Sequence, residues 1–78
     1  MNTGYYVGKW VSSLISKNGD GGAIKIVAAY IGNHLGRELV KAVIAGASGT
    51  KIGTLLGAKM GSLAGPVGTF LGGLAGAL

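Results

Sequence analysis

The stretch from Gly49 to Gly76, GTKIGTLLGAKMGSLAGPVGTFLGGLAG, decides the fold that we expect of this 78-residue chain. Its glycines recur at every fourth position except for one three-residue step, at Gly49, Gly53, Gly57, Gly61, Gly65, Gly68, Gly72 and Gly76. Residues four apart share one face of a helix, so the repeat predicts a glycine zipper, a stripe without side chains against which another backbone can pack closely. Glycine inside a helix costs roughly 0.5–1 kcal/mol relative to alanine, so close packing must offset that cost.

The preceding segment, Ala23 to Gly46, has the pattern of an amphipathic helix. At roughly 100° per residue its polar side chains fall on one face, which carries Asn33, His34, Arg37, Glu38 and Lys41. The opposite face is apolar and includes two further helix-packing glycines four residues apart, Gly32 and Gly36. This apolar face is predicted to pack on the zipper helix.

Two glycine-rich runs mark where the helices should be interrupted. KNGDGG at Lys17–Gly22 combines turn-forming Asn and Asp with glycine and predicts a hinge or tight loop. AGASGT at Ala45–Thr50 predicts a helix end followed by a cap for the next helix, formed by Ser48 or Thr50.

The predicted fold is therefore all-α and forms one small domain over residues 1–78. It consists of a helical hairpin, two long antiparallel helices packed through glycines, with a short N-terminal arm. The expected segments are an arm and turn over 1–22, an amphipathic helix over 23–46, a bend over 47–51 and a glycine-zipper helix over 52–78.

The inventory of reactive side chains argues against an enzyme. The chain has no cysteine, one histidine and two acidic residues, Asp20 and Glu38. His34 and Glu38 lie four apart, but a solvated pair of this kind is far more common than a catalytic one. Neither a phosphate-binding loop of the GxxxxGK[ST] type nor a GxGxxG motif is present. We expect no catalysis, no cofactor and no metal site.

Positive charge is the main chemical feature, because Lys and Arg number seven and the net charge is +5. Such a balance favours contact with phosphate groups, although solubility alone could also explain it. No zinc finger, RNP signature or helix-turn-helix is recognisable, so binding of DNA should be independent of base sequence. The residues expected to contact phosphates lie around the predicted bend: Lys51, Lys41, Arg37 and Lys59.

Together, the small size, the glycine-spaced helices of Ala23–Leu78 and the basic bend resemble the short, all-helical, alanine- and glycine-rich coat proteins of rod-shaped and filamentous viruses, in particular those of bacilliform archaeal viruses. This resemblance implies a subunit that assembles with copies of itself as helical hairpins around DNA, with Lys51 and its neighbours facing the genome. It places the protein in a virion. The apolar C-terminal residues differ from filamentous bacteriophage coat proteins, whose C-terminus is strongly basic.

Two other classes remain open. A membrane-active, bacteriocin-like peptide would also be small, cationic and rich in GxxxG, and it would be secreted and membrane-associated. Residues 60–78 carry no charged side chain and are long enough to span a bilayer, although Gly, Ala, Ser and Thr contribute little transfer energy. A conjugative-type pilin would share the hairpin and basic bend, but it should have two uniformly apolar helices, which Arg37, Glu38 and Lys41 contradict.

Overall fold

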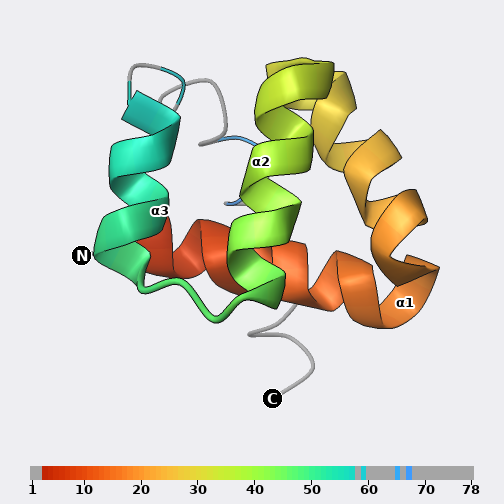
Figure 1. Ribbon diagram of the computed structural model, residues 1–78, viewed down its shortest axis with the longest axis horizontal. Helices are drawn as coiled ribbons and strands as arrows, with labels where there is room; N and C mark the ends of the chain where they lie inside the picture. Colours follow the sequence, from red (N-terminus) through yellow and green to blue (C-terminus); the bar gives the residue numbers. More distant parts are fainter. Residues whose placement is uncertain (1–2, 58, 60–64, 66, 68–78) are drawn as a thin grey trace.

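The computed structural model describes residues 3–57, 59, 65 and 67, and this part of the chain is all-α, as the sequence predicts. It contains three helices, α1 (Thr3–Ile31), α2 (Asn33–Ile44) and α3 (Gly49–Leu56). The first half of α1 lies across the base of the molecule, and its second half rises beside α2 (Figure 1). Both α2 and α3 stand on the first half of α1 and run in opposite directions.

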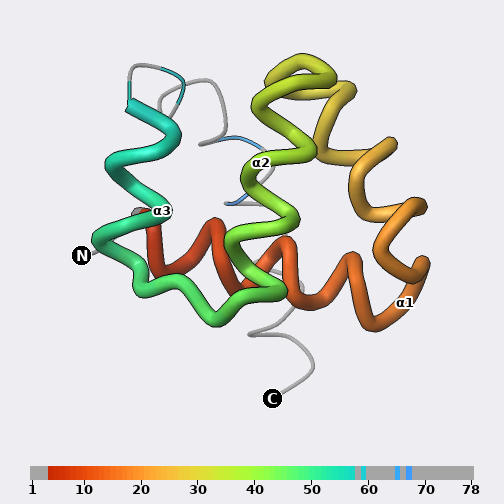
Figure 2. The backbone as a smooth tube through the Cα atoms, in the orientation of Figure 1, coloured from red at the N-terminus to blue at the C-terminus, as the bar shows by residue number. Residues whose placement is uncertain are grey.

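Helix α1 changes direction at Gly19, whose backbone angles (φ 75°, ψ 172°) are not helical. The tube in Figure 2 shows the chain turning sharply between the two halves of this helix. Just before the kink, the Asn18 side-chain amide donates a hydrogen bond to the Leu14 carbonyl at 3.1 Å. The hinge predicted at Lys17–Gly22 is therefore present, but helix continues on both sides of it.

The hydrophobic core draws side chains from all three helices. Its most deeply buried members in the helices are Val7, Val11, Ala23, Val27, Leu39, Val40, Ile52 and Leu56. Full burial of one Val, Leu or Ile side chain contributes roughly 1.5–3 kcal/mol, so a small set of contacts accounts for much of the fold's stability. Helix α1 packs against both α2 and α3, whereas α2 and α3 touch each other least.

The N-terminal arm predicted over residues 1–22 is wrong for its described part. Residues from Thr3 onward form the first half of α1, and Val7, Trp10 and Val11 are buried in the core. The Trp10 ring also meets the Tyr30 ring edge to face, with centroids 5.5 Å apart, which joins the two halves of α1. The N-terminal segment is therefore part of the hydrophobic core, and α2 and α3 both pack against α1.

The helix predicted over residues 23–46 is divided at Gly32, whose φ of 93° lies in the left-handed region that glycine adopts without steric cost. The Gly32 amide donates the last hydrogen bond of α1, to the Ala28 carbonyl at 2.8 Å. The Gly32 carbonyl then accepts from the Gly36 amide at 2.9 Å, at the start of α2. One residue therefore turns the chain while both of its own backbone groups keep a hydrogen bond.

The bend between α2 and α3 spans residues 45–48, slightly earlier than the predicted 47–51. The Ala47 amide donates to the Ala42 carbonyl at 2.9 Å and the Gly46 amide to the Val43 carbonyl at 3.0 Å, which is the Schellman pattern of a helix end. Its left-handed position is occupied by Gly46, with φ of 82°. The Ser48 hydroxyl accepts a hydrogen bond from the Lys51 amide at 3.2 Å, as the capping prediction required.

Replacing Gly46 with alanine is expected to lower the free energy of unfolding by about 1–2 kcal/mol, because an L side chain is strained in the left-handed conformation. Gly46→Asn is the matched variant, since asparagine tolerates this conformation better. Urea unfolding followed by circular dichroism measures both. If alanine and asparagine cost the same, the strain at this position is not what makes glycine necessary.

Of the zipper helix predicted over 52–78, the structure describes residues 52–57, 59, 65 and 67. Helix α3 stops at Leu56, where Gly57 has φ of 52°, and residues 65 and 67 are again helical. The zipper glycines Gly61, Gly68, Gly72 and Gly76 lie outside the described residues. Three helices, and not two long ones, therefore make up the described fold.

Candidate glycine contacts and cationic surface

Helices α1 and α3 approach each other backbone to backbone at three glycines. A Cβ atom added at Gly4 would collide with the carbonyl oxygen of Gly49 and lie 2.8 Å from the amide nitrogen of Gly53. No side chain can occupy such a position without moving one helix. Gly49 and Gly53, the first two glycines of the four-residue repeat, therefore face α1 within one chain.

Helices α1 and α2 make a second close contact, at Gly36. A Cβ atom there would lie 2.9 Å from both the Cα and the backbone nitrogen of Ala28. Gly36 was predicted to pack α2 against the zipper helix, but its partner is the second half of α1. The helix break at Gly32 folds α2 back against the end of α1, which directly precedes α2 in sequence.

Three other described glycines that were predicted to pack helices have open space around them. A Cβ at Gly32, Gly57 or Gly65 would meet no atom within 4 Å. Within the described part of the chain these positions mediate no close approach between helices. Contact of these glycines with another copy of the chain stays a prediction.

Sequence reasoning missed Gly4 and Gly8 as packing residues. A Cβ at Gly8 would lie 2.9 Å from Cδ1 of Ile52 on α3, so this glycine also keeps α1 and α3 close. The available signal was the four-residue spacing of Gly4 and Gly8, the same spacing as in the zipper. It was obscured because the segment mixes aromatic and β-branched residues, which fit a strand as well as a helix.

Helix α2 separates its polar and apolar residues as predicted. The described polar side chains Asn33, His34, Arg37, Glu38 and Lys41 are all exposed, whereas Leu39 and Val40 are buried on the other side. Leu39 and Val40 are covered by the core within the molecule, whereas the charged face of α2 is exposed and accessible to a partner.

The four cations predicted to contact phosphates are all exposed, but the fold does not gather all of them. Lys41 lies in the last turn of α2 and Lys51 in the first turn of α3, so both flank the bend at residues 45–48. Arg37 is one helical turn further back on the face of Lys41. Lys59 follows the opposite end of α3 and is therefore separated from the bend by the length of that helix.

Metal and membrane sites receive no support from the described residues. In that part of the chain no three His, Cys, Asp or Glu side chains cluster closely enough to hold a metal ion. Across the same residues no helix combines the length and apolar character needed to cross a bilayer. Most of the uncharged segment 60–78 considered as a span lies outside the described residues.

Comparison with known protein families, curated proteins and solved structures found no match to this chain. Function must therefore be argued from the residues and their geometry.

Proposed function

We propose that this chain is a structural subunit that assembles with copies of itself on DNA, as the coat protein of a rod-shaped or filamentous virus does. The observation that carries the proposal is the placement of cations around the bend. Lys41 and Lys51 are exposed at the bend end of the antiparallel helices α2 and α3. Both helices bury side chains in the core, Leu39 and Val40 from α2 and Ile52 and Leu56 from α3. Each subunit thus presents a positively charged end on a self-contained scaffold.

Charge neutralisation is the chemistry that such an end supports. DNA carries one negative charge per roughly 1.7 Å of helix axis, so many closely spaced cationic subunits are needed to offset it. Lysine side chains meet phosphates as point charges and read no base edge, which makes the interaction independent of sequence. A repeated subunit with net charge +5 meets this requirement without any recognition motif.

We propose that self-association uses glycines that are open among the described residues. At Gly32 and Gly57 an added methyl group would contact no described residue beyond its chain neighbours, so a neighbouring backbone can approach them. The two-helix hairpin with zipper packing is proposed for this assembled state, in which Gly61, Gly68, Gly72 and Gly76 contact neighbouring copies. Binding of a partner would offset the cost of so many helical glycines.

A salt titration of DNA binding tests the proposal. If the three cations at the bend end, Arg37, Lys41 and Lys51, each neutralise one phosphate, the affinity should fall by about 40-fold between 50 and 200 mM salt, and by about 100-fold if Lys59 also takes part. Two duplexes of unrelated sequence should bind equally at every salt concentration. A flat salt dependence, or strong preference for one duplex, would remove the phosphate-neutralising role.

A membrane-active, bacteriocin-like peptide is the second candidate, and exposed aromatic residues favour it. The Tyr5 and Tyr30 side chains are about half exposed, and the Lys9 ammonium group lies 5.4 Å from the centre of the Tyr5 ring. Tyrosine and lysine are common at the boundary between lipid and water. Release of dye from anionic vesicles at protein concentrations that do not condense DNA would favour this function over the coat subunit.

A further inference from the structure

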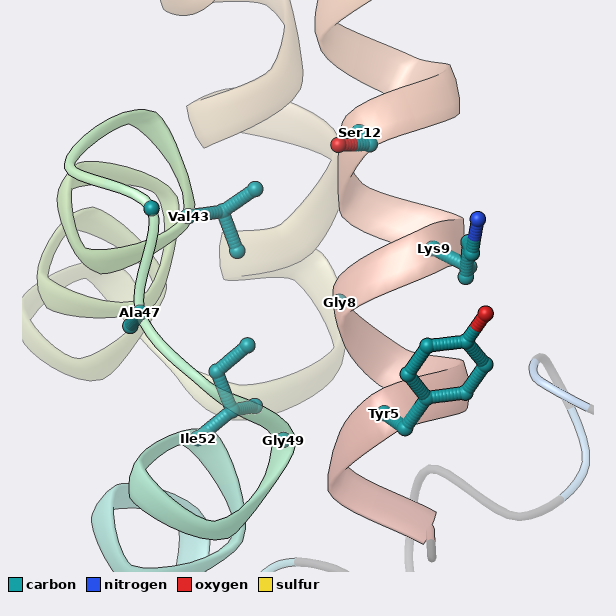
Figure 3. A pocket seen from close by; sticks show the side chains of 9 residues that line it. Tyr5, Gly8, Lys9, Ser12, Val43, Ala47, Gly49 and Ile52 are labelled. Carbon is teal, nitrogen blue, oxygen red and sulfur yellow. The ribbon is translucent and has the colours of Figure 1, made fainter.

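A shallow pocket of about 260 Å³ lies between the first half of α1 and the segment that joins α2 to α3 (Figure 3). Its two sides differ in chemistry. The opposite wall is aliphatic and consists of Val43 at the end of α2, Ala47 in the bend and Ile52 in α3. The α1 side is polar at its rim, where Lys9 and Ser12 are exposed.

Glycines create the hollow, because three positions around it lack side chains. Gly8 lies on α1, Gly46 in the bend and Gly49 at the start of α3. At Gly8 even a methyl group would approach Cδ1 of Ile52, another lining residue, to 2.9 Å, so a side chain there would narrow the space between α1 and α3. The same residues that permit close helix packing therefore leave a space beside it.

The charged residue of the pocket indicates the kind of ligand that fits it. Among the described residues that line it, Lys9 is the only charged one, and none is a carboxylate. Its ammonium group is held near the rim by the Tyr5 ring, at 5.4 Å from the ring centre. In Figure 3 the Ser12 hydroxyl lies on the pocket side of α1, one turn along from Gly8. A ligand that complements this arrangement has an anionic head and an aliphatic body.

We propose that this pocket binds one molecule of a single-chain anionic lipid. The alkyl chain lies against Val43, Ala47 and Ile52, and the anionic head lies near the Lys9 ammonium and the Ser12 hydroxyl. The volume is below the roughly 300–1,000 Å³ usual for drug-sized ligands, so it suits part of one chain better than a two-chain lipid. The aliphatic wall offers no stacking surface for a nucleotide base. This site adjoins the bend that carries the proposed DNA contacts, but it uses Lys9 and Ser12 of α1 and not Lys41 or Lys51.

Dodecanoate is the probe, added below its micelle concentration to the uniformly ¹⁵N-labelled full chain. We expect saturable shifts of the Gly8, Gly46 and Gly49 amide resonances. Inorganic phosphate, which has the head charge without the chain, and dodecyltrimethylammonium, which has the chain with the opposite charge, should not reproduce them. Equal shifts with phosphate would show a simple anion site, and shifts spread over all amides without saturation would show unspecific adsorption. Either result overturns the proposal.

Two pairs of variants locate the ligand. Ser12→Phe fills the pocket from its exposed rim and should abolish the saturable shifts, whereas Ser16→Phe, one turn along and outside the pocket, should leave them unchanged. Lys9→Gln should weaken binding by about tenfold, the value of one charge-assisted contact, and Lys25→Gln should have no effect. Unchanged dodecanoate binding by a folded Ser12→Phe variant would contradict the assignment. These experiments do not measure binding to vesicles or DNA. A negative result would therefore overturn the lipid site but would not affect the coat function, which the salt titration tests.

Discussion

Replacing Gly4 with alanine is expected to lower the free energy of unfolding by about 1–3 kcal/mol, the usual cost of forcing extra volume into a close-packed contact. The added methyl group would meet the backbone of Gly49 and Gly53, which cannot rotate away as a side chain can. Helices α1 and α3 must therefore separate and expose part of the core around Ile52. For a domain of this size each kcal/mol lowers the melting temperature by about 4–8 °C.

Gly21→Ala is the matched control, because Gly21 is also inside α1 but exposed, with no atom within 4 Å of a new methyl group. Alanine should be neutral there or raise the free energy of unfolding by about 0.5–1 kcal/mol, since it is the better helix former. Thermal unfolding of both variants decides the matter. Similar melting temperatures for the two variants would show that α1 and α3 do not depend on a glycine contact.

Reversing two charges beside the bend should have the largest effect on DNA binding. The double variant Lys41→Glu with Lys51→Glu removes two of the proposed phosphate contacts. Their loss corresponds to about 50-fold in affinity at 0.1 M salt and a decrease of about 1.8 in the salt slope. Both side chains are exposed, so helix content measured by circular dichroism should not change.

The control for this variant is Lys17→Glu with Lys25→Glu, which changes the net charge equally on α1, away from the bend. Its affinity for DNA should fall less, and its salt slope should stay closer to that of the unmodified chain. Equal losses in the two double variants would mean that only total charge matters. In that case the bend would not be the DNA-contacting end of the subunit.

Local patterns were sufficient to predict the parts of the fold that depend on neighbours in sequence. The periodicity of α2 predicted which of its faces is exposed. The AGASGT run predicted a glycine helix end and a cap at Ser48 or Thr50, and Ser48 forms the cap. These features depend on spacing and on short-range hydrogen bonds, which a sequence states directly.

Features that depend on tertiary contacts could not be predicted in the same way. The apolar pattern of residues 23–46 continues without interruption through Gly32, so it predicted one helix. A turn made by a single glycine does not change the spacing of the apolar residues around it. Burial of Val7 and Trp10 depends on α2 and α3 being in place, and nothing local distinguishes that from an exposed arm. For the candidate site, the sequence predicted that Lys41 and Lys51 flank the bend, and both are exposed there. The separation of Lys59 from them depends on where α3 ends, which the continuous glycine spacing did not indicate.

The central claim is that this chain assembles with itself around DNA, and electron microscopy of the purified protein tests it most directly. The protein is imaged without lipid or detergent, alone and after mixing with linear double-stranded DNA at low salt. The account predicts regular rods or filaments of constant diameter that enclose the DNA and protect it from nuclease. Dispersed single subunits with DNA left bare and nuclease-sensitive would contradict it.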